Sequence, residues 1–257
     1  MLRTYVELQD YRIGATDGTI GHVRDCYFDD VAWVVRYLIV DTARWFSGRQ
    51  VLISPISLGT PDTLTREFPV ALTRAQVRGS PGVDTAKPVS RQHEMQYLDY
   101  YSYPYYWGGL GFWGGGYYPS DLVAANHVDT RPDREALNAD PHLRSCDAVL
   151  RYRISASDGE IGHVEGYLVD TDTWAIRYLV VATSNWLLGH RVLVSPLWIE
   201  RISWIESYVV VDLTREAVRN APRYAAGVPL ERADEAAMYR YYERDGYWAA
   251  EPPRLAA

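Results

Sequence analysis

The sequence predicts a mainly β protein built from two small β-barrels in tandem, each followed by short helices and joined by a connector rich in tyrosine, tryptophan and glycine. Three observations predict this fold: a gapless internal repeat, short segments in which apolar residues alternate with polar ones, and helix caps followed by prolines. The chain has 257 residues, of which 47% are apolar, and is therefore long enough for two domains with hydrophobic cores.

The repeat has a constant offset of 141 residues. Residues 2–107 align with 143–248, and 39 of these 106 positions are identical. The matched stretches include Tyr11-Arg12-Ile13 with Tyr152-Arg153-Ile154, Ile20-Gly21-His22-Val23 with Ile161-Gly162-His163-Val164, Arg36-Tyr37-Leu38 with Arg177-Tyr178-Leu179, and Tyr106-Trp107 with Tyr247-Trp248. We therefore predict barrels at 2–80 and 143–221, a tail helix and connector at 81–142, and a C-terminal helical tail at 222–257.

Each copy has the pattern of several short strands. In residues 20–28, alternation predicts one face with Ile20, His22, Arg24, Cys26 and Phe28, and an opposite face with Gly21, Val23, Asp25 and Tyr27. Further strands are expected over 33–40, 50–53 and 67–71, with 207–212 as the counterpart of the last. Strands this short and apolar, separated by turn residues, are typical of a small closed barrel, which protects its edges.

The segments after the strands indicate helices. Thr73 and Thr214 are predicted N-caps of short helices at 74–78 and 215–219, which Pro81 and Pro222 end. Each tail carries a second helix candidate, at 90–101 and at 230–242.

Composition excludes several classes of protein. The net charge is −7, and Lys87 is the single lysine, so the chain lacks the basic cluster that nucleic-acid binding requires. Cys26 and Cys146 are expected to be unlinked thiols in a reducing compartment, because neither lies in a C-x-x-C pair. Neither a signal peptide nor an apolar run long enough to span a membrane is evident. We expect a soluble, cytoplasmic protein without a cofactor.

Two histidines recur at the offset, His22 and His163, and are the candidates for a metal ligand or an acid–base group. Catalysis by a histidine needs a nucleophile or proton target within hydrogen-bond reach, and a zinc site needs further ligands. Neither accompanies these residues in the sequence, so we expect structural histidines. Asp170-Thr171-Asp172 lacks the glycine and terminal glutamate of a calcium loop and is expected to be a turn.

The candidate interaction residues are arginines and aromatics. Arg36 and Arg177 interrupt apolar strands, and either pair with a carboxylate such as Asp29 or Asp170 or present a recognition fork. Trp45 and Trp186 lie in predicted loops, where they either anchor an interface or close the end of a barrel.

The connector, residues 97–118, carries most of the aromatic side chains between the copies. Its interaction candidates are Tyr105, Tyr106, Trp107, Phe112, Trp113, Tyr117 and Tyr118. A solvated linker would not keep this much apolar area exposed. We therefore predict that the connector is irregular but packed on a barrel or on a partner.

The segment from Asp17-Gly18 through Gly21-His22-Val23, Arg36-Tyr37-Leu38-Ile39-Val40-Asp41-Thr42 and Val51-Leu52-Ile53-Ser54-Pro55 resembles the PRC-barrel family, and its counterpart in the second copy does so too. This family is named for the cytoplasmic domain of the photosynthetic reaction-centre H subunit, and the layout is similar to that of bacterial tandem PRC-barrel proteins. The resemblance implies small β-barrels used for protein–protein contact, with no shared catalytic site.

Together these features predict a non-catalytic scaffold or adaptor that binds a protein partner, itself included, and that is not an enzyme. The alternative is a regulatory protein that binds a small ligand or a metal in a cleft between the barrels. A deep pocket with converging polar groups would favour the alternative, and a flat apolar patch would favour the scaffold.

Overall fold

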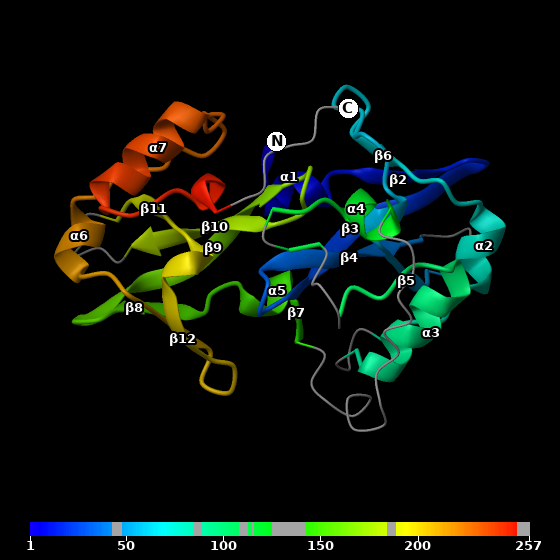
Figure 1. The fold of residues 1–257 in the computed structure, drawn as a ribbon, viewed down its shortest axis with the longest axis horizontal. Helices are drawn as coiled ribbons and strands as arrows, with labels where there is room; N and C mark the ends of the chain where they lie inside the picture. The colour runs from blue at the N-terminus through cyan, green and yellow to red at the C-terminus, as the bar shows by residue number, and fades with distance from the viewer. Residues whose placement is uncertain are drawn as a thin grey trace. The chain divides into compact units, whose positions relative to one another are not determined.

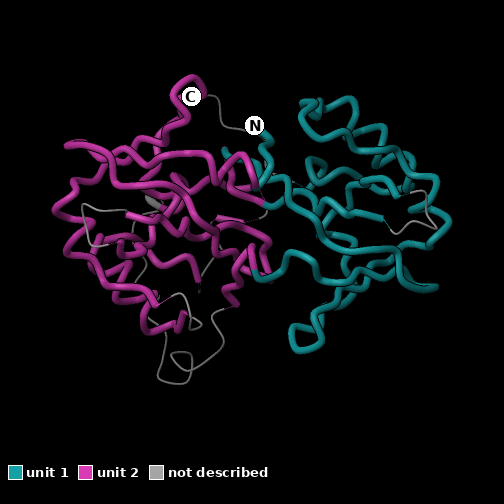
Figure 2. The backbone as a smooth tube through the Cα atoms, turned by 180° about the vertical axis from the view of Figure 1, so that it is seen from behind, with its two compact units in different colours: residues 1–5, 148–171, 176–257 teal, residues 6–147, 172–175 magenta. Residues whose placement is uncertain are grey.

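The computed structural model describes residues 1–42, 48–84, 89–107, 113–114, 116–124, 142–183 and 189–250. The chain forms two mixed β-sheets, which confirms the mainly β fold. Its contacts divide it into two units: unit 1 contains residues 1–5, 148–171 and 176–257, and unit 2 contains residues 6–147 and 172–175 (Figure 2).

The sheet of unit 2 has the strand order β5-β4-β3-β2-β6, with β7 paired to β3 outside this path (Figure 1). Its strands are β2 (Arg12–Ala15), β3 (Gly18–Asp29), β4 (Val34–Asp41), β5 (Gln50–Ile53), β6 (Glu67–Pro69) and β7 (Leu143–Ser145). All neighbours are antiparallel except β2 and β6, which run parallel. The twelve-residue strand β3 binds three strands and is therefore the centre of the unit.

The sheet of unit 1 repeats this arrangement in the order β11-β10-β9-β8-β13-β12, with β1 paired to β9. Its strands are β1 (Leu2–Thr4), β8 (Arg153–Ala156), β9 (Gly159–Asp170), β10 (Ile176–Thr183), β11 (Arg191–Val194), β12 (Ile199–Ser203) and β13 (Tyr208–Val211). Here β8 and β13 are the parallel pair. Strand β9 has the same central position as β3.

Short helices follow the strands as the capping residues predict. Their bounds are α1 (Tyr5–Gln9), α2 (Arg74–Gly79), α3 (Arg91–Tyr101), α4 (Pro119–Ala124), α5 (Cys146–Val149), α6 (Arg215–Arg219) and α7 (Arg232–Tyr241), with 3₁₀ turns at Pro55–Ser57, Pro196–Trp198 and Tyr247–Ala249. Thr73 caps α2 by accepting a hydrogen bond from the backbone N–H of Gln76, and Thr214 caps α6 in the same way through Ala217. Both predicted N-caps are confirmed.

The first strand of each copy pairs in the sheet of the other copy. Strand β1 lies at the start of the first copy but pairs with β9, and β7, its counterpart at the offset of 141, pairs with β3. The chain therefore passes from one unit to the other after Tyr5 and again after Asp147. The units consequently do not coincide with the ranges 2–80 and 143–221, because the first strand of each range pairs in the sheet formed by the other range.

The alternation predicted for residues 20–28 holds only in the first half of β3. His22 and Arg24 are exposed while Gly21 and Val23 are buried, but Ile20, predicted on the face of His22, is buried, and Asp25 to Phe28 are buried without a break. The register of β3 against β4 shifts between Val23 and Asp25, which marks a β-bulge. The prediction of two alternating faces is therefore wrong beyond the bulge.

Glycine is required where β3 and β9 cross the end of the neighbouring strand. A Cβ on Gly21 would lie 1.8 Å from the carbonyl oxygen of Asp41, and one on Gly162 would lie 2.0 Å from that of Ala182. Backbone cannot retreat as a flexible side chain can, so a methyl group here must displace a strand.

We predict that Gly21→Ala and Gly162→Ala each lower the free energy of unfolding by about 1–3 kcal/mol or more. Gly166→Ala is the matched control on β9, because its Cβ would meet Val180 at an ordinary 3.9 Å. Urea unfolding measures all three. Equal stability of the Gly21 and Gly166 variants would show that the strands do not approach this closely.

Candidate functional site

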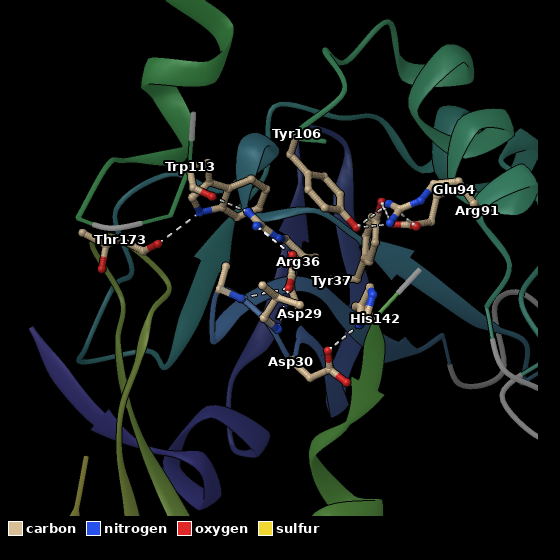
Figure 3. Close-up of polar contacts among 12 residues, drawn as sticks. Asp29, Asp30, Arg36, Tyr37, Arg91, Glu94, Tyr106, Trp113, His142 and Thr173 are labelled. Carbon is tan, nitrogen blue, oxygen red and sulfur yellow. Dashed lines mark hydrogen bonds and ion pairs between the residues drawn. The ribbon is translucent and has the colours of Figure 1, made fainter. Parts of the chain in front are cut away.

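The polar side chains singled out by the repeat form a buried cluster in unit 2 (Figure 3). Arg36, on β4, is 3% exposed, and its Nη2 lies 3.0 Å from Oδ2 of Asp29 at the end of β3. The guanidinium carbon lies 4.1 Å from the centre of the Tyr106 ring, in cation–π contact. The predicted pairing of Arg36 with Asp29 is confirmed, and the buried arginine presents no fork to a partner.

Glu94 is the deepest ionisable group of this cluster and was not among the sequence candidates. It lies in the first turn of α3 and is fully buried. Its Oε1 accepts hydrogen bonds from the hydroxyls of Tyr37, at 3.1 Å, and of Tyr106, while its Oε2 lies 2.9 Å from Nη1 of Arg91. Such partners are what a carboxyl group needs inside a protein. The carboxyl therefore fastens the helix and the start of the connector to the sheet.

Unit 1 contains the same cluster at the offset of 141. Arg177 pairs with Asp170 at 3.1 Å and lies 4.0 Å from the centre of the Tyr247 ring. Glu235 accepts hydrogen bonds from Tyr178, at 2.6 Å, and from Tyr247, at 2.9 Å. Tyr106 and Tyr247 therefore make equivalent contacts, each within its own unit.

Burial governs the electrostatics of Glu94. Loss of hydration raises its pKa from the usual 4.5 to about 7, although Arg91 and the hydroxyls of Tyr106 and Tyr37 act in the opposite direction. Burial also raises the pKa of Tyr37 well above its usual range, and the neighbouring Glu94 adds to that shift. Tyr37 therefore remains a hydrogen-bond donor across the neutral range.

The connector is buried in part on unit 2, as predicted. Trp113 is 1% exposed; its carbonyl oxygen accepts a hydrogen bond from Arg36 at 2.6 Å, and its indole N–H donates to the carbonyl of Thr173 at 3.1 Å. In Figure 3 the rings of Trp113 and Tyr106 both border the Arg36 guanidinium, and they meet each other edge to face with ring centres 6.2 Å apart. These two aromatics therefore pack in the interior of unit 2.

The other connector candidates lie closer to the surface. Tyr105 is half-buried, stacks on Trp107 and donates a hydrogen bond to Asp99 at 2.5 Å. Trp107 covers the guanidinium of Arg91 at 4.2 Å. Tyr117 is exposed and Tyr118 is half-buried. The candidates Trp45, Phe112 and Trp186 lie outside the described residues.

The two candidate histidines are exposed. His22 and His163 occupy equivalent positions on β3 and β9, and both point away from the cores. Within the described ranges, no group of three His, Cys, Asp or Glu side chains is arranged to hold a metal ion. Nor is any described helix long and apolar enough to cross a membrane.

A repeated exposed apolar side chain was missed by the sequence reasoning. Leu64 is 95% exposed and Ile205, at the offset of 141, is 97% exposed. Each lies at the tip of a turn, followed two residues later by a residue with a left-handed backbone: Arg66 at φ 52° and Ser207 at φ 55°. The signal that could have found them is the offset itself, which aligns two aliphatic residues in otherwise dissimilar turns.

Side chains hold both tips in place. Asp62 accepts hydrogen bonds from the backbone N–H groups of Leu64 and Thr65, at 2.8 and 3.1 Å. These same N–H groups lower the pKa of Asp62, so its carboxylate keeps the turn closed at neutral pH. In the second copy Ser203 accepts from the N–H of Glu206 at 3.2 Å. Both tips are therefore presented on ordered turns.

No protein-family model matches the chain, and no curated protein matches it. The class that the fold defines is thus a mainly β protein with two mixed sheets, whose duplicated polar clusters lie inside the units.

Glu94 makes a pH-dependent contribution to stability. Because its pKa in the folded chain is about 7 and its usual value is 4.5, the folded state holds a proton that the unfolded chain loses between these values. Stability from this group is complete below about pH 4.5 and is lost as the pH rises to about 7. We predict that Glu94→Gln, which keeps the neutral form at every pH, flattens the pH dependence of the melting temperature in this window.

The exposed Glu216→Gln is the control and should leave the pH dependence as in the parent. Melting curves from pH 4 to pH 8 provide the measurement. A Glu94→Gln variant with the parent's pH profile would contradict the burial of an ionisable carboxyl at this position.

Proposed function

We propose that the chain is a non-catalytic scaffold or adaptor in which two PRC-type barrels present binding surfaces to a protein partner or to a second copy. The observation that carries the proposal is the pair of ordered turns bearing Leu64 and Ile205, each more than nine-tenths exposed. Single exposed apolar residues are common on protein surfaces. These two recur at one offset, on turns that each place a residue with a left-handed backbone two positions later, and that recurrence distinguishes them.

The chemistry of the tips suits recognition of a protein. A leucine or isoleucine held on a rigid turn loses little conformational freedom when it enters a pocket, and burying such a side chain contributes about 1.5–3 kcal/mol. Two tips on one chain also allow bivalent binding, in which the second contact forms at a high effective concentration. The matching partner has a small apolar pocket, or two of them.

The buried clusters support a structural role for the polar residues. Arg36 and Arg177 are each held by a carboxylate of their own unit and covered by a tyrosine ring. Their charges are satisfied inside the units, which leaves recognition to the turns that carry Leu64 and Ile205. The resemblance of both copies to PRC barrels agrees with this division, because that family uses a small barrel for protein–protein contact.

A reducing, cytoplasmic location is part of the proposal. Cys26 and Cys146 are both reduced and buried, and burial together with the neighbouring Cys26 thiol raises the pKa of Cys146 well above its usual range. A thiol with a raised pKa is a poor nucleophile, so Cys146 is not suited to nucleophilic catalysis. The alternative of a small ligand or a metal between the barrels stays a prediction.

The test replaces the tips with a charge. Leu64→Asp, Ile205→Asp and the double variant should fold as the parent does, because both side chains are almost fully exposed. Partners captured from the native host and identified by mass spectrometry should be lost with the double variant. Each single variant should bind more weakly, by up to about 10²–10⁴-fold where one partner engages both tips.

Val228→Asp is the matched control, since Val228 is exposed but does not lie on these turns. It should keep every partner and the parent's mass in light scattering. Full capture by the double variant would show that the tips are not the binding surface.

A further inference from the structure

The two exchanged strands pair with their acceptor strands in the same register. Strand β1 pairs Leu2 with Asp170, and β7 pairs Leu143 with Asp29, so donor and acceptor are both displaced by 141 residues. The neighbouring hydrogen bonds agree: the N–H of Thr171 donates to the carbonyl of Met1 at 3.0 Å, and the N–H of Asp30 donates to that of His142 at 2.8 Å. Both acceptor strands thus bind the same ligand, a short strand that begins Leu-Arg.

Side chains fix the donor segment on β3. Asp25 is buried there and accepts hydrogen bonds from the hydroxyl of Ser145, at 2.5 Å, and from the N–H of Asp147, at 3.1 Å. Asp30 forms an ion pair with Arg144, at 2.7 Å, and its Oδ1 lies 2.9 Å from Nδ1 of His142. One carboxylate thus contacts the beginning of β7 and the other contacts its end, and together they hold this strand in a single register.

A hydrophobic contact completes each site just beyond the donor strand. In unit 1 the buried ring of Tyr5 packs edge-on against Tyr167, with ring centres 5.7 Å apart. At the offset of 141 the same positions are Cys146 and Cys26, which are both buried in unit 2 and interact through their thiols. The two cysteines therefore come from opposite copies, one on the donor segment and one on the acceptor strand.

We infer that β3 and β9 are strand-binding sites for the first strand of another copy, and that two chains associate by the same exchange in trans. Copy 1 of one chain would then complete copy 2 of a second chain, and the reverse. An acceptor strand recognises backbone and a few side chains, and it cannot distinguish a donor on its own chain from one on a second chain. The connector favours the intramolecular form only through effective concentration, of the order of millimolar.

This inference rests on the self-association part of the proposed function and deepens it. The exchanged segments do not include Leu64 or Ile205, so the Leu64→Asp, Ile205→Asp double variant should exchange as the parent does. Loss of partner binding with exchange retained, or the reverse, shows which of the two proposals has failed.

The native cysteines report the exchange in the full chain. Equal amounts of ¹⁴N- and ¹⁵N-labelled chain are unfolded together in urea, refolded at high protein concentration, and separated by size. Each fraction is oxidised with diamide in its folded state. Oxidation is complete when a sample unfolded in urea contains no free thiol. The azo group of diamide takes up two electrons and two protons from the two thiols as the disulfide forms.

The monomer should yield a Cys26–Cys146 disulfide within one isotope only. The dimer should yield the same disulfide joining ¹⁴N to ¹⁵N peptides in about half of the molecules, because its donor and acceptor lie on different chains. Refolding at low protein concentration should remove the dimer.

A matched variant carries Arg3→Pro and Arg144→Pro, which interrupt both donor strands, and it should give no mixed disulfide. The proposal is overturned if the parent forms no dimer at any concentration, or if its dimer contains only single-isotope disulfides. Failure of the monomer to form the Cys26–Cys146 disulfide would also overturn it, because the two thiols would then lie apart.

Discussion

The fold depends on the pairing of the first strand of each copy with the long central strand of the other. Strands β3 and β9 each bind three neighbours, and the third is always supplied by the other copy. Each exchanged strand forms only three residue pairs in its ladder, so further contacts hold it. Asp25 and Asp30 supply them in unit 2, and Tyr5 with Tyr167 supplies them in unit 1. Neither sheet is complete without both halves of the sequence, which makes the duplication a structural requirement.

The buried clusters begin beside the first residue of each exchanged strand. Asp29 and Asp170 pair in the ladder with β7 and β1, and their carboxylates bind Arg36 and Arg177. Tyrosine rings then link these arginines to the helices that carry Glu94 and Glu235. The interior polar groups thus tie strand exchange, helix docking and the tail that follows the helix into one network in each unit, while the apolar turn tips remain outside it.

Much of this could be predicted from sequence, because it depends on local chemistry. The offset fixed the duplication, Thr73 and Thr214 revealed their helices, and arginines in apolar strands required carboxylates such as Asp29. The exchange could not be predicted: the alternation of Leu2–Thr4 is too short to detect, and the sequence of a donor strand is the same whichever copy accepts it. Glu94 was missed because a glutamate in a first helical turn is typical of a solvated face.

Hydrogen exchange in the full chain tests the strand exchange most directly. The alternation of an antiparallel ladder makes Arg3 and Val169 a hydrogen-bonded pair, and Arg144 and Phe28 its counterpart. If the first strands are exchanged, Arg3→Pro speeds amide exchange in residues 166–171, at the end of β9, and leaves residues 25–30 protected, whereas Arg144→Pro has the opposite effect. Faster exchange at residues 25–30 in the Arg3→Pro variant would show that each copy keeps its own first strand, and would contradict the account.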